Sequence, residues 1–185
     1  MQEDSGGCGF RRGGLGYDKR IRSLGKSRLI SNADRSVLSC YGVNGGKASK
    51  SYQVSVLKNQ EETVYPGMCD SVVVEENNMV RIVTTGGGGW GDPLLREIDN
   101  VVYDLQCGLI SERSARDDYG VSVSLVGRKW QADIEESAKL RKEIKSRRGK
   151  LAMFDRGSKF SDLSKRKQIK IPDGWVDPDK GWYAK

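Results

Sequence analysis

Two glycine-rich segments hold the residues whose types and spacing could do chemistry. Residues 5–16 place six glycines around Arg11 and Arg12. The backbone N–H groups of such a loop, together with two guanidinium groups, can hold a phosphate or a carboxylate, so both arginines are candidate anion contacts. The alternative is a set of turns and bulges without a ligand. No Gly-Lys-Ser/Thr closes the segment, so it is not a P-loop.

The second segment consists of Thr85, Gly86, Gly87, Gly88, Gly89, Trp90, Gly91 and Asp92. Each glycine would cost roughly 0.5–1 kcal/mol if it only continued a strand or a helix. Their backbone freedom should therefore serve a positive φ, or the close approach of another backbone or a ligand. We expect the ring of Trp90 to be buried, and Asp92 before Pro93 to turn the chain toward a helix. Gly86–Gly89, Trp90 and Asp92 form a candidate site-shaping loop.

Other candidates for chemistry are sparse. The sequence has no histidine, so the commonest general base near neutral pH and the commonest transition-metal ligand are missing. The four cysteines, Cys8, Cys40, Cys69 and Cys107, lie far apart and form no Cys-x-x-Cys pair. We therefore expect free thiols rather than a zinc site. No catalytic residue and no metal ligand are assigned.

The composition predicts a folded chain that is rich in turns, with 36% hydrophobic residues and 23 glycines among 185 residues. No apolar run approaches the roughly 18 residues of a membrane-spanning helix. The N-terminus lacks the basic and then apolar order of a signal peptide. We expect a soluble, cytoplasmic protein without a membrane partner.

The fold class expected is α+β: a mainly β, glycine-rich domain, then a helical hairpin, a longer helix and an extended basic arm. Short strands are expected within residues 17–35 and at 52–56, and residues 71–83 have the pattern of a β-hairpin. Asn44-Gly45 is a hairpin-turn signal. The expected domains are residues 1–127, a docking helix over 128–150 and the arm over 151–185.

Helix signals follow the second glycine segment. Asp99 is the predicted N-cap of a helix ending at Gly108, and Ser111 is the predicted cap of the next one, which makes a helical hairpin. Residues 121–125 alternate like a strand that returns to the main sheet. The longest helix is expected over residues 133–148, with a thin apolar stripe.

The C-terminal part carries the positive charge. From Arg128 onward there are 17 Lys and Arg against 9 Asp and Glu, whereas the first 127 residues are nearly neutral. Beyond residue 150 we expect no regular secondary structure, but an arm whose aromatic rings fill pockets on a partner or on the chain's own body. These rings belong to Phe154, Phe160, Trp175, Trp182 and Tyr183.

Several motifs occur in a fixed order across residues 4–148. They are Asp4-Ser5-Gly6-Gly7, Arg12-Gly13-Gly14-Leu15-Gly16, Ala33-Asp34-Arg35, Tyr41-Gly42 with Gly45-Gly46, the segment from Thr85 to Leu94, Asp104, Gly108-Leu109-Ile110-Ser111, and Ala115 with Tyr119-Gly120-Val121. Together they resemble the C-terminal region of the hydantoinase B/oxoprolinase family. That family commonly has Tyr where this chain has Trp90.

The resemblance implies a function within a complex. Members of the family work with a hydantoinase A-like subunit that binds ATP, in the ATP-dependent opening of cyclic amides. Related complexes carboxylate acetone or acetophenone. The resemblance thus implies a small subunit that completes a split hydantoinase B-type subunit, in a ketone carboxylase or a hydantoinase/oxoprolinase complex. A split into several chains favours the carboxylase branch.

The implied partners are a larger hydantoinase B-like chain and a hydantoinase A-like chain. ATP with Mg and a transition metal are expected in those partners, with no cofactor here and no catalysis by the isolated chain. On this hypothesis the Gly86–Gly89 loop shapes a wall near the partner's active site, and Gly87→Val would abolish turnover of the intact complex.

Two other functions stay open. The basic C-terminal part and Arg11-Arg12 would also suit a nucleic-acid or polyanion binding module, although we expect nucleic acid less than a protein partner. A free-standing phosphate-binding enzyme is the third possibility, and the missing histidine and P-loop argue against it.

Overall fold

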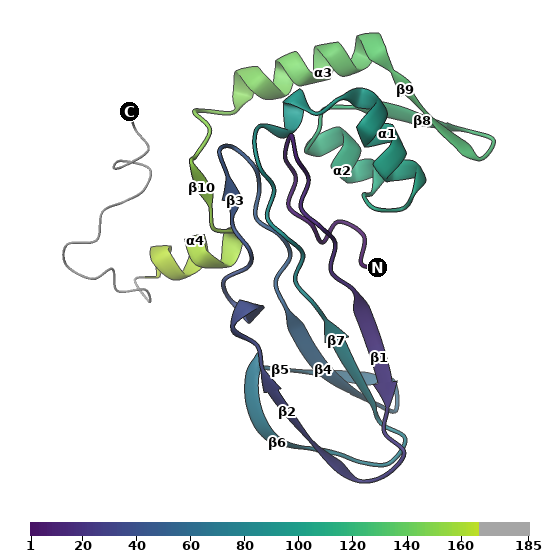
Figure 1. The fold of residues 1–185 in the computed structure, drawn as a ribbon, viewed down its shortest axis with the longest axis vertical. Coiled ribbons are helices and arrows are strands. Elements are labelled where there is room, and N and C mark those ends of the chain that lie inside the picture. The colour runs from purple at the N-terminus through teal and green to yellow at the C-terminus, as the bar shows by residue number, and fades with distance from the viewer. Residues whose placement is uncertain (167–185) are drawn as a thin grey trace.

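A four-stranded antiparallel sheet forms one end of the elongated molecule in the computed structural model, which describes residues 1–166 (Figure 1). Its strands lie in the order β1 (Asp18–Arg22), β7 (Met79–Val83), β4 (Gln53–Lys58) and β5 (Glu61–Tyr65). Alternate residues of a strand face the same side of a sheet. Val54 and Val56 of the central strand β4 are accordingly both buried on one face.

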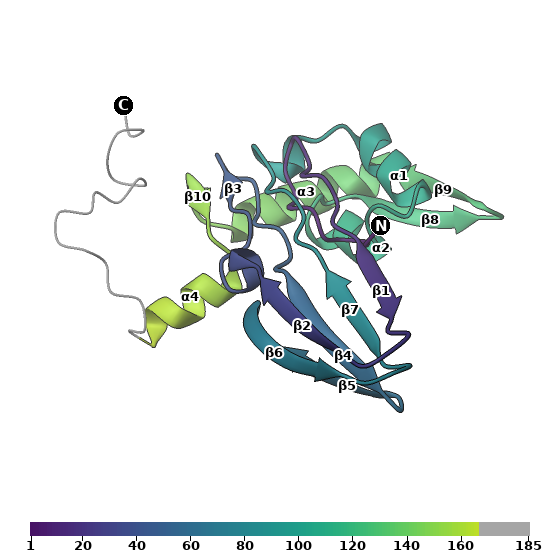
Figure 2. The same ribbon diagram turned by 60° about the horizontal axis from the view of Figure 1, so that its bottom comes forward.

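A two-stranded ribbon of β2 (Ser27–Asn32) and β6 (Met68–Val74) lies beside this sheet in both ribbon views (Figures 1 and 2). The predicted hairpin over residues 71–83 is wrong, because β6 pairs with β2 whereas β7 lies between β1 and β4. The strand locations follow from local alternation. Their pairing is set by which faces bury apolar side chains against each other, and that depends on contacts distant in the sequence.

Helices form the opposite end of the molecule: η2 (Pro93–Leu95), α1 (Ile98–Gln106) and α2 (Glu112–Asp117). Ser111 caps α2 as predicted, since its side chain accepts a hydrogen bond from Ser114 N at 3.1 Å. Asp99 does not cap α1, which begins one residue earlier and has Asp99 in its first turn. A core cluster joins the two helices and the segment after them: Val101, Leu105, Ile110, Ala115, Tyr119 and Val121.

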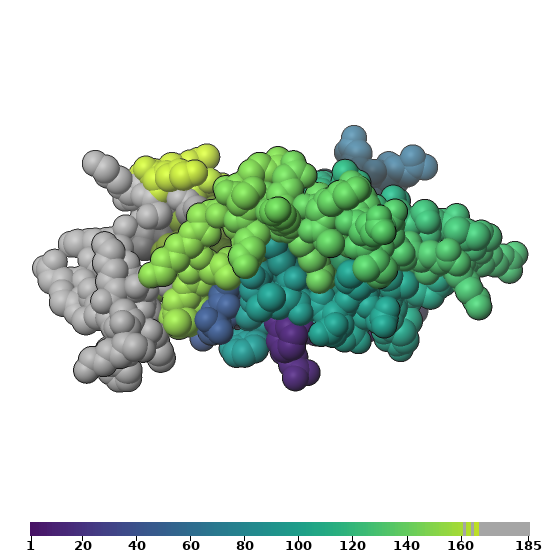
Figure 3. Space-filling view, turned by 90° about the horizontal axis from the view of Figure 1, so that it is seen from above, coloured from purple at the N-terminus to yellow at the C-terminus, as the bar shows by residue number. Residues whose placement is uncertain are grey.

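Residues 121–125 do not return to the main sheet, so that prediction is also wrong. Strand β8 (Ser122–Val126) pairs with β9 (Lys129–Asp133) in a separate hairpin, and its turn contains Gly127 with a φ of 64°. Helix α3 (Ile134–Arg147) follows directly, and Asp133 caps it by accepting from Glu136 N at 2.9 Å. Seen from above, α3 lies over the helical end of the molecule (Figure 3).

The chain after α3 contains regular structure, contrary to expectation. Strand β10 (Phe154–Asp155) pairs with β3 (Gly42–Val43), and helix α4 (Ser158–Lys165) follows. The rings of Phe154 and Tyr41 pack edge to face with centroids 5.6 Å apart. This part of the arm therefore docks on the chain's own body. Trp175, Trp182 and Tyr183 lie outside the described residues. The remaining element is the 3-10 turn η1 (Asp34–Ser36).

The fold class is α+β, as predicted. None of the helices in residues 1–166 is both long enough and apolar enough to cross a membrane.

Candidate functional site: the glycine core and its polar rim

Three extended segments, residues 5–16, 40–49 and 84–91, run side by side between the sheet and the helices and constitute the glycine core (Figure 1). In the 84–91 segment burial recurs every third residue, at Gly86 and Gly89 and at Val83 just before it. A period of three is that of an extended polyproline II helix rather than of a pleated strand.

Backbone hydrogen bonds hold the segments together. The N–H of Gly7 donates to Gly87 O at 2.8 Å, and the N–H of Gly87 donates to Gly14 O at 2.9 Å. On the other side, Gly89 N donates to Lys47 O and Val43 N donates to Gly89 O, each at 2.9 Å. The 84–91 segment is therefore the central one, since it bonds to both neighbours.

The close approach of these backbones explains the glycine run. A Cβ atom on Gly88 would lie 1.8 Å from Tyr41 O, and one on Gly89 would lie 2.1 Å from Cys8 O. Gly87 has more room, with its nearest neighbour at 3.2 Å. None of Gly86–Gly89 has a positive φ. The glycines are there because other backbones, not a ligand, occupy the space of their side chains.

The prediction for Trp90 is wrong, because the residue is 49% exposed. Its backbone exchanges two hydrogen bonds of 2.9 Å with Arg11, and this pairing at the end of the core directs the ring outward. The ring contacts Phe10 edge to face at 6.4 Å between centroids. The Trp90 side chain therefore lies on the surface of the glycine core.

Asp92 turns the chain toward a helix, as predicted. Its carboxylate accepts from Leu94 N at 2.9 Å at the start of η2. The same carboxylate accepts hydrogen bonds from both terminal nitrogens of Arg148, and the bond from Nη1 is 2.7 Å long. Partial burial opposes the charge of Asp92, but the bonds from Arg148 and Leu94 N hold its pKa below the usual range. Asp92 therefore fastens the end of α3 to the core.

The two candidate anion contacts have different surroundings. Arg12 Nε lies 3.1 Å from Asp104 Oδ2, and Arg96 Nη2 lies 2.8 Å from the same oxygen. Asp104 is only 3% exposed, so Arg12 holds a buried carboxylate of its own chain. Arg11 is exposed, and its guanidinium lies 5.4 Å from the ring centroid of Phe10.

A polar cavity of about 400 Å³, the Cys8 pocket, opens beside the core. Lys47 Nζ lies 2.7 Å from one oxygen of Asp118, and Ser114 Oγ donates to the other at 2.9 Å. The same hydroxyl lies 3.7 Å from Cys8 Sγ. Sequence reasoning missed this group, because its members come from three segments and none belongs to a recognised motif.

The Cys8 pocket is suited to binding rather than to nucleophilic attack. Burial, and next the charge of Asp118, raise the pKa of the Cys8 thiol to about 11, so the thiol is protonated near neutral pH. Burial by itself lowers the pKa of Lys47, but the hydrogen bond from its ammonium to Asp118 outweighs this effect and raises the pKa of Lys47 overall. Burial likewise raises the pKa of Tyr119, whose hydroxyl lies beside the thiol. All four cysteines are free, as predicted.

The sequence model of hydantoinase B/oxoprolinase matches residues 1–93. This is half of the chain, and the protein belongs to the hydantoinase B/oxoprolinase family. An uncharacterized protein of Methanocaldococcus jannaschii is 36% identical over 141 residues, which are 76% of this chain and 25% of that protein. The B component of a putative D-/L-hydantoinase from a Pseudomonas species is 25% identical over 144 residues, which are 77% of this chain and 24% of that protein.

Solved structures share the fold. A nucleotide-free acetone carboxylase aligns with a TM-score of 0.66 at 18% identity, covering 97% of this chain and 32% of its own. An ATP-dependent caprolactamase from Pseudomonas jessenii aligns with a TM-score of 0.63 at 26% identity, covering 76% of this chain and 25% of its own. The chain thus spans about a quarter of the length of the curated relatives named above.

Proposed function

We propose that this chain is a scaffold portion of a hydantoinase B-type subunit, within an ATP-dependent complex that opens cyclic amides. The observation that carries the proposal is the glycine core, whose backbones are packed too closely to admit a ligand among them. The segments that define the family resemblance thus build a rigid connection between the sheet and the helices. Relatives named as hydantoinase, 5-oxoprolinase and caprolactamase support amide opening as the reaction.

The proposed partners are a larger hydantoinase B-like chain and a hydantoinase A-like chain that binds ATP. ATP would activate the amide by phosphorylating its carbonyl oxygen, which makes the carbon a better electrophile. Mg, ATP and a transition metal are proposed to reside in these partners. This chain would contribute shape and contacts rather than a reacting group.

Ketone carboxylation is the second candidate. It is favoured by the acetone carboxylase alignment, which covers 97% of this chain against 76% for the caprolactamase. Activation of a ketone and of bicarbonate by ATP follows the same phosphorylation logic, so a scaffold of one fold suits either reaction.

The outer face of the β2–β6 ribbon supports a protein partner. Ile30, Met68 and Val73 are 69%, 66% and 49% exposed, and the pairing register puts all three on the side opposite the buried Val74. Adjacent exposed apolar side chains of this kind mark interaction surfaces. We propose that the larger hydantoinase B-like chain covers this face.

The test is reconstitution. The chain is co-expressed with hydantoinase A-like and larger hydantoinase B-like chains from its own source, and ATP-dependent turnover is measured with hydantoins, 5-oxoproline and lactams, and separately with ketones and bicarbonate. We expect one stable complex whose turnover requires this chain. Unchanged turnover when the chain is omitted would refute the proposal.

Two variants and a salt series refine the test. Ile30→Glu should prevent assembly, whereas Leu125→Glu, at a residue 55% exposed on the separate β8–β9 hairpin, should not. Loss of binding as salt rises from about 50 to 200 mM, with nucleic acid as the co-purifying species, would instead support the polyanion-binding alternative.

A further inference from the structure

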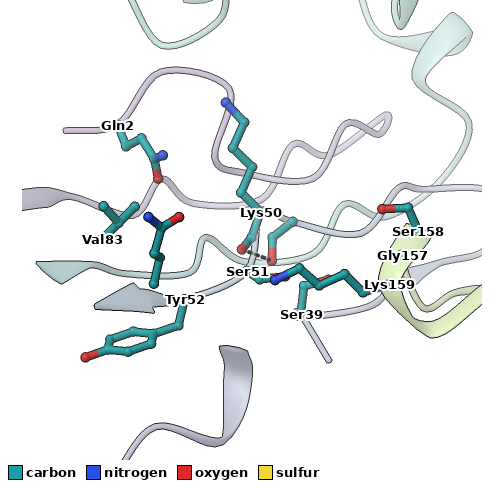
Figure 4. Close-up of a pocket in the computed structure, with 11 residues that line it drawn as sticks. Gln2, Ser39, Lys50, Ser51, Tyr52, Val83, Gly157, Ser158 and Lys159 are labelled. Carbon is teal, nitrogen blue, oxygen red and sulfur yellow. Dashed lines mark hydrogen bonds between the residues drawn. The ribbon is translucent and has the colours of Figure 1, made fainter. Parts of the chain in front are cut away.

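A second cavity, of about 350 Å³, lies where the N-terminal segment, the residues leading into β4 and the start of α4 meet (Figure 4). We call it the Lys159 pocket. Among the described residues its lining contains four serines and two lysines, and no carboxylate. It therefore differs from the Cys8 pocket, where Asp4, Asp117 and Asp118 line the wall.

The two lysines of this pocket have no acidic partner in the part of the chain that the structure describes. Lys159 Nζ donates to Ser36 O at 2.7 Å, and Lys50 Nζ donates to Glu3 O at 3.1 Å. Neither ammonium forms an ion pair with a carboxylate within residues 1–166. A backbone carbonyl satisfies a hydrogen bond but carries no negative charge, and both lysines are exposed, so solvent is what meets their positive charge within the described chain. An anion in the pocket would compensate it.

Helix α4 adds positive potential at the same wall. It begins at Ser158, and Gly157, Ser158 and Lys159 all line the pocket. The first N–H groups of a helix have no partner within the helix, and the helix dipole is positive at this end. Asp155 Oδ1 accepts from Gly157 N at 2.9 Å just before the helix, so the N–H groups of the first turn, from Ser158 onward, are what α4 offers to an anion beside Lys159.

Buried polar atoms line the pocket as well. The Gln2 side-chain oxygen is buried and has no hydrogen-bond partner within the described part of the chain. Its amide extends from the N-terminal segment into the region drawn in Figure 4, opposite Lys159. Ser39, only 6% exposed, brings a hydroxyl to the wall from another segment. An unpaired buried amide oxygen is costly, and a ligand that donates a hydrogen bond to it would remove that cost.

We infer that the Lys159 pocket binds a small oxyanion, either a phosphate group or a carboxylate. Lys159 and the first N–H groups of α4 would face the anionic oxygens, and the hydroxyls of Ser39 and Ser51 would donate to them. The Gln2 amide would bind a protonated oxygen or an N–H of the ligand. The cavity exceeds the volume of a phosphate ion, which leaves room for an organic remainder. This inference does not depend on the proposed function.

Calorimetric titration of the full chain tests it, first with inorganic phosphate and then with glutarate, each at an ionic strength held constant with sodium chloride. We expect saturable binding of at least one anion. Lys159→Gln should weaken it about tenfold, the loss of one charge-assisted hydrogen bond. Lys165→Gln, which removes an exposed lysine at the other end of α4, should leave it unchanged.

The two titrations also distinguish between the two kinds of anion. Binding of phosphate alone identifies a phosphate group as the ligand's anion, and binding of glutarate alone identifies a carboxylate. Ser51→Ala should weaken binding in either case without removing a charge. The inference is overturned if neither anion binds saturably, or if Lys165→Gln weakens binding as much as Lys159→Gln does.

Discussion

Replacement of Gly88 by alanine should destabilise the fold more than its single added methyl group suggests. The new Cβ would lie 1.8 Å from Tyr41 O and 2.6 Å from Tyr41 C. Side-chain carbons do not approach other atoms within 3.0 Å, so one of the two backbones has to retreat by about 1 Å or more. Neither can do so freely, since Gly42 pairs with Asp155 of β10, and the N–H and the carbonyl of Gly89 both bond to the 40–49 segment.

The cost follows from this geometry. Overpacking a core costs about 1–3 kcal/mol when side chains can adjust, and here only backbone can move. Alanine also lowers the conformational entropy of the unfolded chain relative to glycine, which stabilises the folded protein by about 0.4–1 kcal/mol. We expect a net loss of about 2–4 kcal/mol, out of the roughly 5–15 kcal/mol typical of a domain.

Urea unfolding followed by circular dichroism measures this loss. Gly14→Ala is the matched control within the same core: Gly14 has no positive φ, and nothing lies within 4 Å of the position that a Cβ atom would take there. It should be neutral or stabilising by up to about 1 kcal/mol. A free energy of unfolding for Gly88→Ala within about 1 kcal/mol of the unaltered protein, or an equal loss in both variants, would show that close backbone contact does not limit this position.

Three further predictions concern the polar contacts around the core. Asp104→Asn leaves two mostly buried guanidinium groups, each on a side chain 15% exposed, without their shared anion. It should cost about 3–5 kcal/mol in urea unfolding; a loss below about 1 kcal/mol would contradict this. Folding raises the pKa of Cys8 from 9.0 to about 11. The stability that this shift contributes to the folded protein is therefore fully present below pH 9 and is lost between pH 9 and pH 11, by at most about 1.4 kcal/mol per pH unit. Cys8→Ser should flatten that part of the stability curve, and an unchanged slope would contradict the assignment. Arg148→Ala leaves Asp92 partly buried and unpaired, and should cost about 1–3 kcal/mol. It should also speed hydrogen exchange in the last turn of α3, and unaltered exchange would show that the helix end is held by other contacts.

Features that depend on a few neighbouring residues could be predicted from the sequence. Ser111 caps the helix that follows it, because a cap requires only a side-chain oxygen within three residues of a free N–H. Asp133, expected as the first residue of the long helix, is its cap instead. Asn44 and Gly45 form a turn with φ values of 53° and 90°, which their types tolerate. The turn does not join a hairpin as predicted, because β3 before it pairs with the distant β10. The ordered glycine motifs likewise sufficed for the family, which the match over residues 1–93 confirms.

The tertiary structure alone decided the features that join distant segments. Alternation located β6 and β7 but could not pair them, since the pairing depends on which apolar faces bury each other. Composition showed that Gly88 needs space, and only the fold shows that a carbonyl from residue 41 fills it. The carboxylate held by Arg12 comes from Asp104, 92 residues away. Local propensity depends on neighbouring residues, which the sequence shows directly. The energy of close packing and of buried charge depends on groups that come into contact only after folding.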